Sequence, residues 1–457
     1  MRMSKQIRLP AASRRDVRST WPAPLLAVFL IVGAAFAPLN WPASAQHPAP
    51  GNETTSATAR DAAFTAATNE VLKETSEIRE LPVLRAVHSS AQSRAEIERM
   101  IIDNLDRETK PGQIHATEVT LKKLGLAPPD FNLRDLMIRL LTEQVAGYYD
   151  PKTQQFHLAD WIDVDGQKPI MAHELTHALQ DQHFNLRRFE HWPKGDSDAE
   201  LAAHALIEGD ATLAMSEYVG RSPARMIALF KSLGSAATAT EELDKAPRVV
   251  RESLLFPYQE GLRWTQTLRR YGGWSKVSGA FADLPKSSEQ ILHPEKYFVH
   301  EAPVKITLPD LTATLNGRRA SASGWKRIDF DVNGEWGTYL LLDEFLKSPT
   351  ESREASAGWG GDSYAVYENG NGLVLYVAVS AWDREQDARE FFDAYVKRTE
   401  VRYPGATNSE AANLVETHRS YETSDGNIII EKVGLRVRVL EGLPKGVDRK
   451  AILKMLG

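Results

Sequence analysis

The stretch MAHELTHALQDQ at residues 171–182 contains an HExxH pattern formed by His173, Glu174 and His177. Apolar residues recur around it at helical spacing, which predicts a helix over 168–184. Two residues four positions apart on a helix lie about 40° apart around its axis and one turn apart along it. Both imidazoles can therefore reach one cation. Glu174 projects from the same turn, where a general base for a water molecule beside the metal is needed.

The competing interpretation makes these histidines ordinary core residues. Against it, apolar side chains form one face of the predicted helix, whereas His173 and His177 lie on a different, polar side together with Gln180. The pattern also stands between a predicted hairpin and a second predicted helix that carries carboxylates. We therefore favour metal binding.

Two histidines leave a zinc ion in need of a third protein ligand and an open position for water. A metzincin-type site would use His183, but that pattern needs Gly where Gln180 stands. On a helix that continues, His183 lies about 120° away from His177. The other route takes a ligand from a helix predicted over 197–219. Three residues on one face of that helix qualify by spacing alone: Glu200, His204 and Glu208.

HELTHALQDQ, followed about thirty residues later by ALIEGDAT, resembles the gluzincin arrangement of the thermolysin-like clan of zinc metallopeptidases. The resemblance covers roughly residues 140–300. It is closest to an uncharacterised exported bacterial branch that also carries a motif like SSEQILHP, residues 287–294. It implies Glu174 as catalytic base and, as ligands of one zinc ion per chain, His173, His177 and Glu208.

A ligating imidazole usually donates its other ring N–H to an acceptor. Asp181 and Asp210 are the candidates, although each could equally be an ordinary helix carboxylate. The thermolysin type has Asp where this chain has Thr212, and Asp210 is the acid nearest to that position. Amide hydrolysis also needs a donor for the developing oxyanion. The candidates, for which packing roles are equally plausible, are His293, Tyr148, Tyr149 and Tyr297.

The flanking sequence predicts an α+β fold. A β-hairpin is predicted at 146–159, just before the HExxH helix, because aromatic residues flank the turn sequence DPKT. Its edge strand would let an extended peptide add as one more strand beside the metal. We divide the chain beyond the N-terminus into a helical segment (61–126), a mainly helical zincin-like catalytic domain (127–324) and a C-terminal α+β module (325–457). The helical segment could be a removable pro-segment, a cap over the cleft or the first domain.

Residues 1–45 have the three parts of a secretory signal peptide. Six basic residues and one acidic residue precede an apolar run of 13 residues, 25–37, and Ala43-Ser44-Ala45 follows. The run is shorter than the roughly 18–20 residues that span a bilayer, so we expect cleavage after Ala45 rather than a retained anchor. Residues 46–60 are small and polar, which predicts a linker. The expected location is the periplasm or the medium.

Composition excludes several functions. The chain of 457 residues has no cysteine, which rules out disulfides, thiolate zinc sites, iron–sulfur clusters and a cysteine nucleophile. Its net charge is −6, and loss of a signal peptide that carries +5 leaves −11. So acidic a protein has no electrostatic basis for binding nucleic acid or an anionic membrane. The expected partner is a peptide or protein substrate, with membrane contact only through a retained anchor. The oligomeric state is not predicted.

The sequence therefore predicts an exported zinc metallopeptidase that hydrolyses peptide bonds with a metal-activated water and Glu174 as general base. The alternative is a non-catalytic, zinc-stabilised envelope scaffold or binding protein. Coordination separates the two. A fourth protein ligand, for example His204, would indicate a closed structural site, whereas three ligands with an open position would indicate a catalyst.

Overall fold

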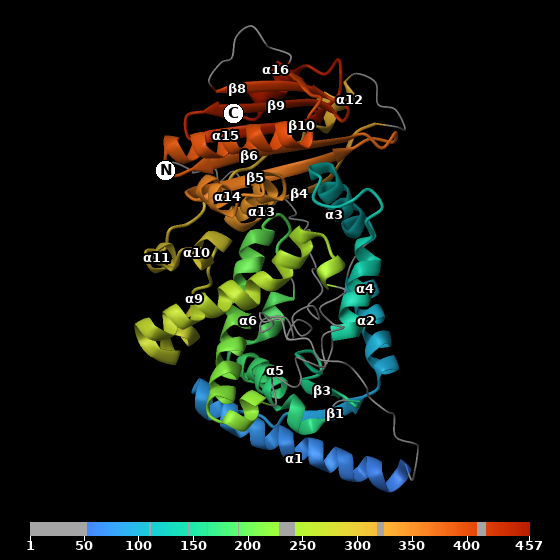
Figure 1. Ribbon diagram of the computed structural model, residues 1–457, viewed down its shortest axis with the longest axis vertical. Helices are drawn as coiled ribbons and strands as arrows, with labels where there is room; N and C mark the ends of the chain where they lie inside the picture. The colour runs from blue at the N-terminus through green and yellow to red at the C-terminus, as the bar shows by residue number, and fades with distance from the viewer. Residues whose placement is uncertain are drawn as a thin grey trace, which may run out of the picture.

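The computed structural model describes residues 53–108, 111–144, 147–161, 163–190, 192–227, 243–317, 324–408 and 417–457. The predicted signal peptide lies outside these ranges. Figure 1 shows a helical part at the bottom and a sheet-rich part at the top of the view. The predicted α+β class is confirmed.

The helical part is built around three long helices, α5 (Val164–Phe184), α6 (Ser197–Gly220) and α9 (Arg248–Ala280). They pack around one apolar core, to which α1 (Glu53–Arg79) contributes one face. The helix predicted over 168–184 is α5, and that predicted over 197–219 is α6. Both helices are buried on nearly all sides, so the polar side that carries His173 and His177 lies inside the protein.

Two glycines let α6 and α9 approach closely. A Cβ atom at Gly209 of α6 would lie 2.2 Å from the carbonyl carbon and oxygen of Gly261 in α9. A Cβ at Gly261 would in turn lie 2.2 Å from the carbonyl oxygen of Ala205. The two backbones can touch only because neither residue has a side chain.

A small sheet precedes α5. Strands β2 (Gly147–Asp150) and β3 (Gln155–Ala159) form the predicted antiparallel hairpin, and β1 (His88–Gln92) pairs with β3 in parallel. Sheet order is β1-β3-β2, so β2 is an edge strand. Strand β1 lies in the segment expected to be helical. Its sequence HSSAQ has no apolar alternation, and pairing with the buried β3 gives it strand form.

The remaining N-terminal elements are α2 (Arg94–Glu108), α3 (Pro111–Leu124) and α4 (Leu133–Gln144). Helix α1 begins at Glu53, inside the stretch 46–60 that was expected to be a linker. After Gly51 that stretch has neither glycine nor proline, and it leads into an alanine-rich sequence that favours helix.

Seven strands of the described residues form an antiparallel sheet in the C-terminal module, in the order β4-β5-β6-β10-β9-β8-β7. The strands are β4 (Lys326–Asp331), β5 (Trp359–Glu368), β6 (Val374–Trp382), β7 (Thr407–Asn408), β8 (His418–Thr423), β9 (Gly426–Val433) and β10 (Arg436–Leu443). Alternate side chains face opposite sides, as Ile428 and Ile429 do. One face carries α3, α13 (Gly334–Leu346), α14 (Pro349–Ser356) and α15 (Glu385–Arg402), and the other α12 (Thr312–Asn316) and α16 (Arg449–Met455).

The SSEQILHP motif joins the two parts of the molecule. It forms α10 (Ser288–Leu292) and the start of α11 (Pro294–Phe298). The Ser288 N–H donates to Asp198 Oδ2 of α6 at 3.0 Å, while the Trp336 N–H of α13 donates to Ser288 Oγ at 3.1 Å. The absence of a side chain at Gly334 lets the C-terminal module approach α6 closely, because a Cβ there would lie 1.8 Å from Asp198 Oδ1.

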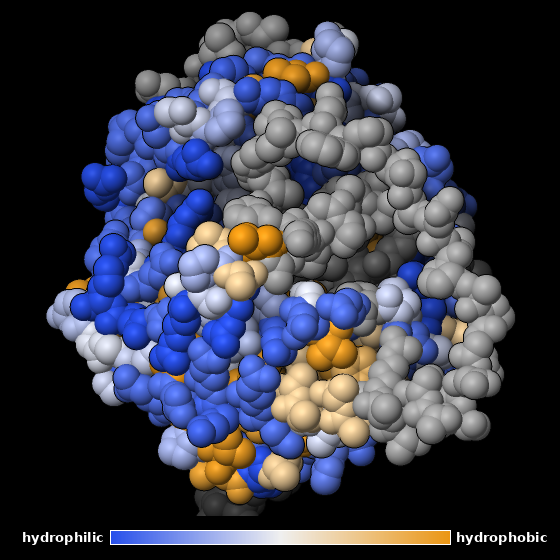
Figure 2. Space-filling view, turned by 60° about the horizontal axis from the view of Figure 1, so that its bottom comes forward, coloured by the Kyte–Doolittle hydropathy of each residue, from blue (hydrophilic) through white to orange (hydrophobic). Residues whose placement is uncertain are grey.

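Among the described residues, no helix combines the length and apolar character needed to cross a membrane. The coloured residues on the face shown in Figure 2 are mainly hydrophilic, with apolar residues in small, separate patches. Patches of this kind are usual on a protein surface.

Candidate metal centre

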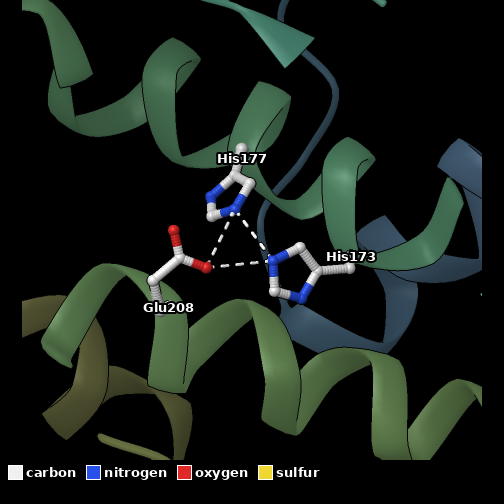
Figure 3. Close-up of side chains that lie close together, drawn as sticks. All are labelled: His173, His177 and Glu208. Carbon is white, nitrogen blue, oxygen red and sulfur yellow. Dashed lines mark hydrogen bonds and ion pairs between the residues drawn. The ribbon is translucent and has the colours of Figure 1, made fainter. Parts of the chain in front are cut away.

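Helices α5 and α6 bring three donor atoms to one point (Figure 3). The Nε2 atoms of His173 and His177 lie 3.0 Å apart. Oε2 of Glu208 lies 3.1 Å from the first and 3.5 Å from the second. All three residues are buried. The structure thus brings together the three residues that the gluzincin resemblance implies as ligands.

The direction of α5 decides which third ligand is possible. Asp163 caps its N-terminus by accepting the Gly166 N–H, and the helix runs on to Phe184, with Asn185 in the left-handed conformation at φ 57°. Since the helix does not turn after His177, His183 points elsewhere and its Nε2 lies 2.7 Å from the Pro82 carbonyl oxygen. The metzincin route is therefore not followed.

The donor set fits a zinc ion. Tetrahedral coordination at zinc–ligand distances of about 2.0–2.1 Å places neighbouring ligand atoms about 3.3 Å apart. The measured separations of 3.0, 3.1 and 3.5 Å bracket that value. Glu208 Oε1, although buried, has no hydrogen-bond partner among the described residues. Two nitrogen lone pairs and a carboxylate that converge in this way are the donors that zinc prefers.

The group has three protein donors rather than four. Within the described ranges, the only histidine and carboxylate atoms that cluster here within 4.8 Å of one another belong to His173, His177 and Glu208. His204 and Glu200, the other candidates on α6, lie outside the cluster. Three protein ligands leave a position for water or substrate.

Glu174 is fully buried next to this group. Its Oε2 accepts the backbone N–H of Tyr149 on β2 at 2.9 Å, while its Oε1 has no hydrogen-bond partner in the described part of the chain. Burial raises the pKa of Glu174 to about 8. The Tyr149 N–H on the free edge of β2 is thus engaged by Glu174. An added peptide strand would have to use other backbone groups of that edge.

The electrostatics of the three donors are strongly coupled. Burial opposes ionisation of Glu208, but the adjacent His177 and His173 lower its pKa to about 2. Burial also opposes charge on His177, yet the Glu208 carboxylate raises the pKa of that ring to about 9. Burial lowers the pKa of His173 to about 4. A metal ion requires an ionised carboxylate and uncharged imidazoles, so these pKa directions suit Glu208 and His173, whereas a metal bound here would have to displace the second proton of His177.

A buried chain of side chains orients the His177 ring. The Nδ1 atom of His177 lies 2.8 Å from Gln180 Oε1, and Gln180 Nε2 donates to Asp210 Oδ2 at 2.9 Å. Asp210 Oδ1 accepts from Nε of Arg79, the last residue of α1. Because a glutamine carbonyl only accepts, Nδ1 of His177 carries a proton, and Nε2 is the ring nitrogen directed at the other two donors.

The two acids considered as partners of the histidines lie in different surroundings. Asp210 reaches His177 only through Gln180. Asp181 instead accepts from the Tyr149 hydroxyl and the Leu186 N–H, each at 3.0 Å, and neither histidine ring is among its hydrogen-bond partners. It ties the end of α5 to β2 and to the turn that follows.

The residues considered for oxyanion stabilisation lie in other contacts. His293 Nε2 lies 2.9 Å from Glu335 Oε1 of α13, in the joint between the two parts of the molecule. The Tyr148 hydroxyl donates to Gln92 Oε1 at 3.1 Å and the Tyr297 hydroxyl to a backbone carbonyl at 2.9 Å. These placements support structural roles for all three residues.

Tyr258 of α9 was not identified from the sequence. Its ring stacks on His173, with centroids 6.1 Å apart and planes inclined by 26°. It also lines a cavity of about 350 Å³ that reaches Glu208 and His204. It stands in an ordinary helical stretch without a recognisable motif, so its nearness to the histidines depends on how α9 crosses α6.

Residues 319–452 match a family model described as a domain of unknown function, DUF8575. No curated protein and no solved structure matches the chain. The matched residues form most of the sheet-rich module, and the three converging donors lie outside them.

Proposed function

We propose that this chain is an exported zinc metallopeptidase whose helical part is zincin-like. The observation that carries the proposal is the convergence of His173, His177 and Glu208 from two helices, with Glu174 on the same helix as the two histidines. The resemblance of the HELTHALQDQ and ALIEGDAT motifs to gluzincins supports it.

Each of these residues has a role in this proposal. His173, His177 and Glu208 would hold one zinc ion, which supplies Lewis acidity toward a water molecule and a peptide carbonyl. Glu174 takes a proton from the attacking water and then gives it to the leaving amine. The fixed N–H of His177, held by Gln180, keeps the other ring nitrogen directed at the donor group.

The number of donors favours a catalyst over the alternative of a zinc-stabilised scaffold. A structural zinc site is usually closed by four protein ligands. Here His204, the residue that could have supplied the fourth, lies outside the cluster formed by the described residues. A cavity lined by Glu208 and by Tyr258, which stacks on His173, could hold a substrate beside this group.

The decisive experiment measures metal content per chain together with cleavage of an unfolded protein, with and without a chelator. We expect one zinc per chain and cleavage that the chelator abolishes. Glu174→Gln should keep the zinc and lose at least about 100-fold in rate, since it removes a general base. His177→Ala should lose both zinc and activity.

Asp165→Asn provides a matched control, because it makes the corresponding change at an exposed position in the first turn of α5. It should leave zinc content and rate unchanged. A Glu174→Gln protein that cleaves as fast as the unchanged protein would overturn the catalytic assignment. Export is tested separately by sequencing the N-terminus of the protein outside the cytoplasm, which we expect to begin at Gln46.

A further inference from the structure

The cavity beside the metal group extends along α6. Its lining includes Glu208, His204, Leu201 and Ser197 of that helix. Ser197 and Glu208 are eleven positions apart, which on a helix corresponds to about 16 Å. Ser197 marks the far end, where its N–H donates to Asp331 Oδ1 of the C-terminal module at 2.8 Å.

The C-terminal module supplies the wall at that far end. Trp336 of α13 lines the cavity, together with Asn333 and Gly337. Both parts of the molecule hold α13 in place, because the Trp336 N–H donates to Ser288 Oγ and the Asn333 N–H donates to Asp362 Oδ2 at 3.0 Å. The module that matches a domain of unknown function therefore lines the same cavity as Glu208.

Most of the lining is apolar, contributed by residues such as Leu105, Met137 and Leu254, but one row on α6 is polar. Glu200 and His204 lie one turn apart on that row. Glu200 is only 5% exposed, and it lines the cavity. A buried carboxylate needs hydrogen bonds, so the cavity suits a ligand that donates hydrogen bonds along this row.

We propose that this cavity is the substrate channel of the peptidase and that it holds an extended apolar segment of a polypeptide on one side of the scissile bond. Trp336 limits the size of the residue accepted at the far end. This inference rests on the proposed function. At about 3.3 Å per residue, a length of about 16 Å holds four or five residues of extended chain.

The polar row favours a polypeptide over a fatty acyl chain. Backbone groups on one side of an extended peptide repeat every two residues, at about 6.6 Å. Glu200 and His204 are separated by about 6 Å along α6, which matches that repeat. An acyl chain has no hydrogen-bond donor for either side chain.

The test measures binding to the Glu174→Gln protein, so that it does not depend on turnover. The probe is a fluorophore-labelled peptide with five consecutive apolar residues, and the comparison peptide has serine at those positions. We expect the apolar peptide to bind at least about 10-fold more tightly than the serine peptide, because burial of even one or two large side chains accounts for such a factor.

Two variants fill the channel from opposite walls, Leu201→Trp on α6 and Met137→Trp on α4, and each should weaken binding about 10-fold or more. Trp336→Ala should shift preference toward a bulkier residue at one end of the peptide. Trp161→Ala is the matched control, because Trp161 is 39% exposed and is not part of the cavity lining. Zinc content and the melting temperature identify any variant that fails to fold.

The channel assignment would be overturned if both folded filling variants bound the apolar peptide as tightly as the Glu174→Gln protein does. It would also be overturned if dodecanoate displaced the apolar peptide and the serine peptide bound as tightly as the apolar one. These outcomes are distinct from failure of the proposed function. Peptide binding that follows the variants, without cleavage by the unchanged protein, would retain the channel and reject the peptidase. Chelator-sensitive cleavage at a rate that the filling variants do not change would retain the peptidase and reject the channel.

Discussion

The sharpest prediction concerns Arg79, which lies in α1 and belongs to the chain of contacts that orients His177. Arg79 and Asp210 form an ion pair in which both side chains have no exposed surface. The guanidinium also lies over the ring of Trp274, 4.5 Å from its centroid. Arg79→Met removes the charge and keeps an apolar stem of similar length. Asp210, the acceptor of the Gln180 amide, then loses its counter-charge.

The structure gives two expected magnitudes. Removal of one partner of a buried ion pair typically costs about 3–5 kcal/mol of folding stability, because the remaining charge is uncompensated. Loss of support for a metal-binding histidine typically lowers metal affinity by about 10–100-fold. The double change Arg79→Met with Asp210→Leu should recover much of the stability, since no buried charge remains. It should not recover zinc affinity, because Gln180 then loses Asp210 as an acceptor and keeps only the Ile207 carbonyl oxygen, 3.0 Å from its Nε2.

Two measurements separate these effects. Urea unfolding of the metal-free protein gives the stability, and competition with a chromophoric chelator gives the zinc affinity. Arg85→Met is the control. That arginine is 43% exposed and lies 3.4 Å from Asp181, so its loss should cost less than about 1 kcal/mol. The reasoning is refuted if Arg79→Met leaves zinc affinity unchanged, or if the double variant regains affinity along with stability.

Three further predictions concern other contacts. Gly209→Ala should destabilise the protein by about 1–3 kcal/mol or more, because its Cβ would meet the Gly261 backbone at 2.2 Å, and an unchanged melting temperature would contradict this. Burial raises the pKa of Asp198 to about 8, so the folded protein keeps a proton that the unfolded chain releases above pH of about 4. The free energy of unfolding should therefore fall as pH rises from about 4 to 8, by up to about 1.4 kcal/mol per pH unit. Asp198→Asn should reduce this dependence on pH, measured by urea unfolding at pH 5 and pH 8. The same dependence in both proteins would refute the assignment. His293→Ala leaves the buried Glu335 without its 2.9 Å partner and should cost about 1–3 kcal/mol with zinc affinity unchanged, whereas weaker zinc binding in a competition assay would place His293 at the metal.

The local features of the site were predictable from the sequence. The HExxH helix, the hairpin before it and the carboxylate-bearing helix after it appear as α5, β2–β3 and α6. Each is marked by a signal within a short window, either a run of residues rich in apolar side chains and long enough for a helix or a turn sequence. Spacing alone left Glu200, His204 and Glu208 equivalent. The way α6 packs against α5 brings Glu208, and not the other two, to the histidines.

The contacts that orient His177 were only partly predictable. Asp181 and Asp210 each follow a ligand closely, and the sequence could not rank them. Asp210 takes part because Gln180 spans the gap between α5 and α6, and it is balanced by Arg79, which is 131 positions away in the chain. No local pattern encodes a pair of that separation. The same holds for β1, whose polar sequence becomes a strand through its partner β3.

The N-terminal segment is an integral part of the fold, which argues against one of the three roles considered for it, that of a removable pro-segment. Phe64, Val71, Leu72 and Ile78 of α1 are buried in the core that also contains α5. Full burial of such side chains contributes about 1.5–3 kcal/mol each. A pro-segment that leaves after export would expose this core, remove β1 from its partner β3 and leave Asp210 without Arg79. It would thereby remove the support of His177 at the moment when activity should begin. The cohesion of α1 with α5 and α6 therefore argues that the segment stays with the metal centre as a permanent part of the domain.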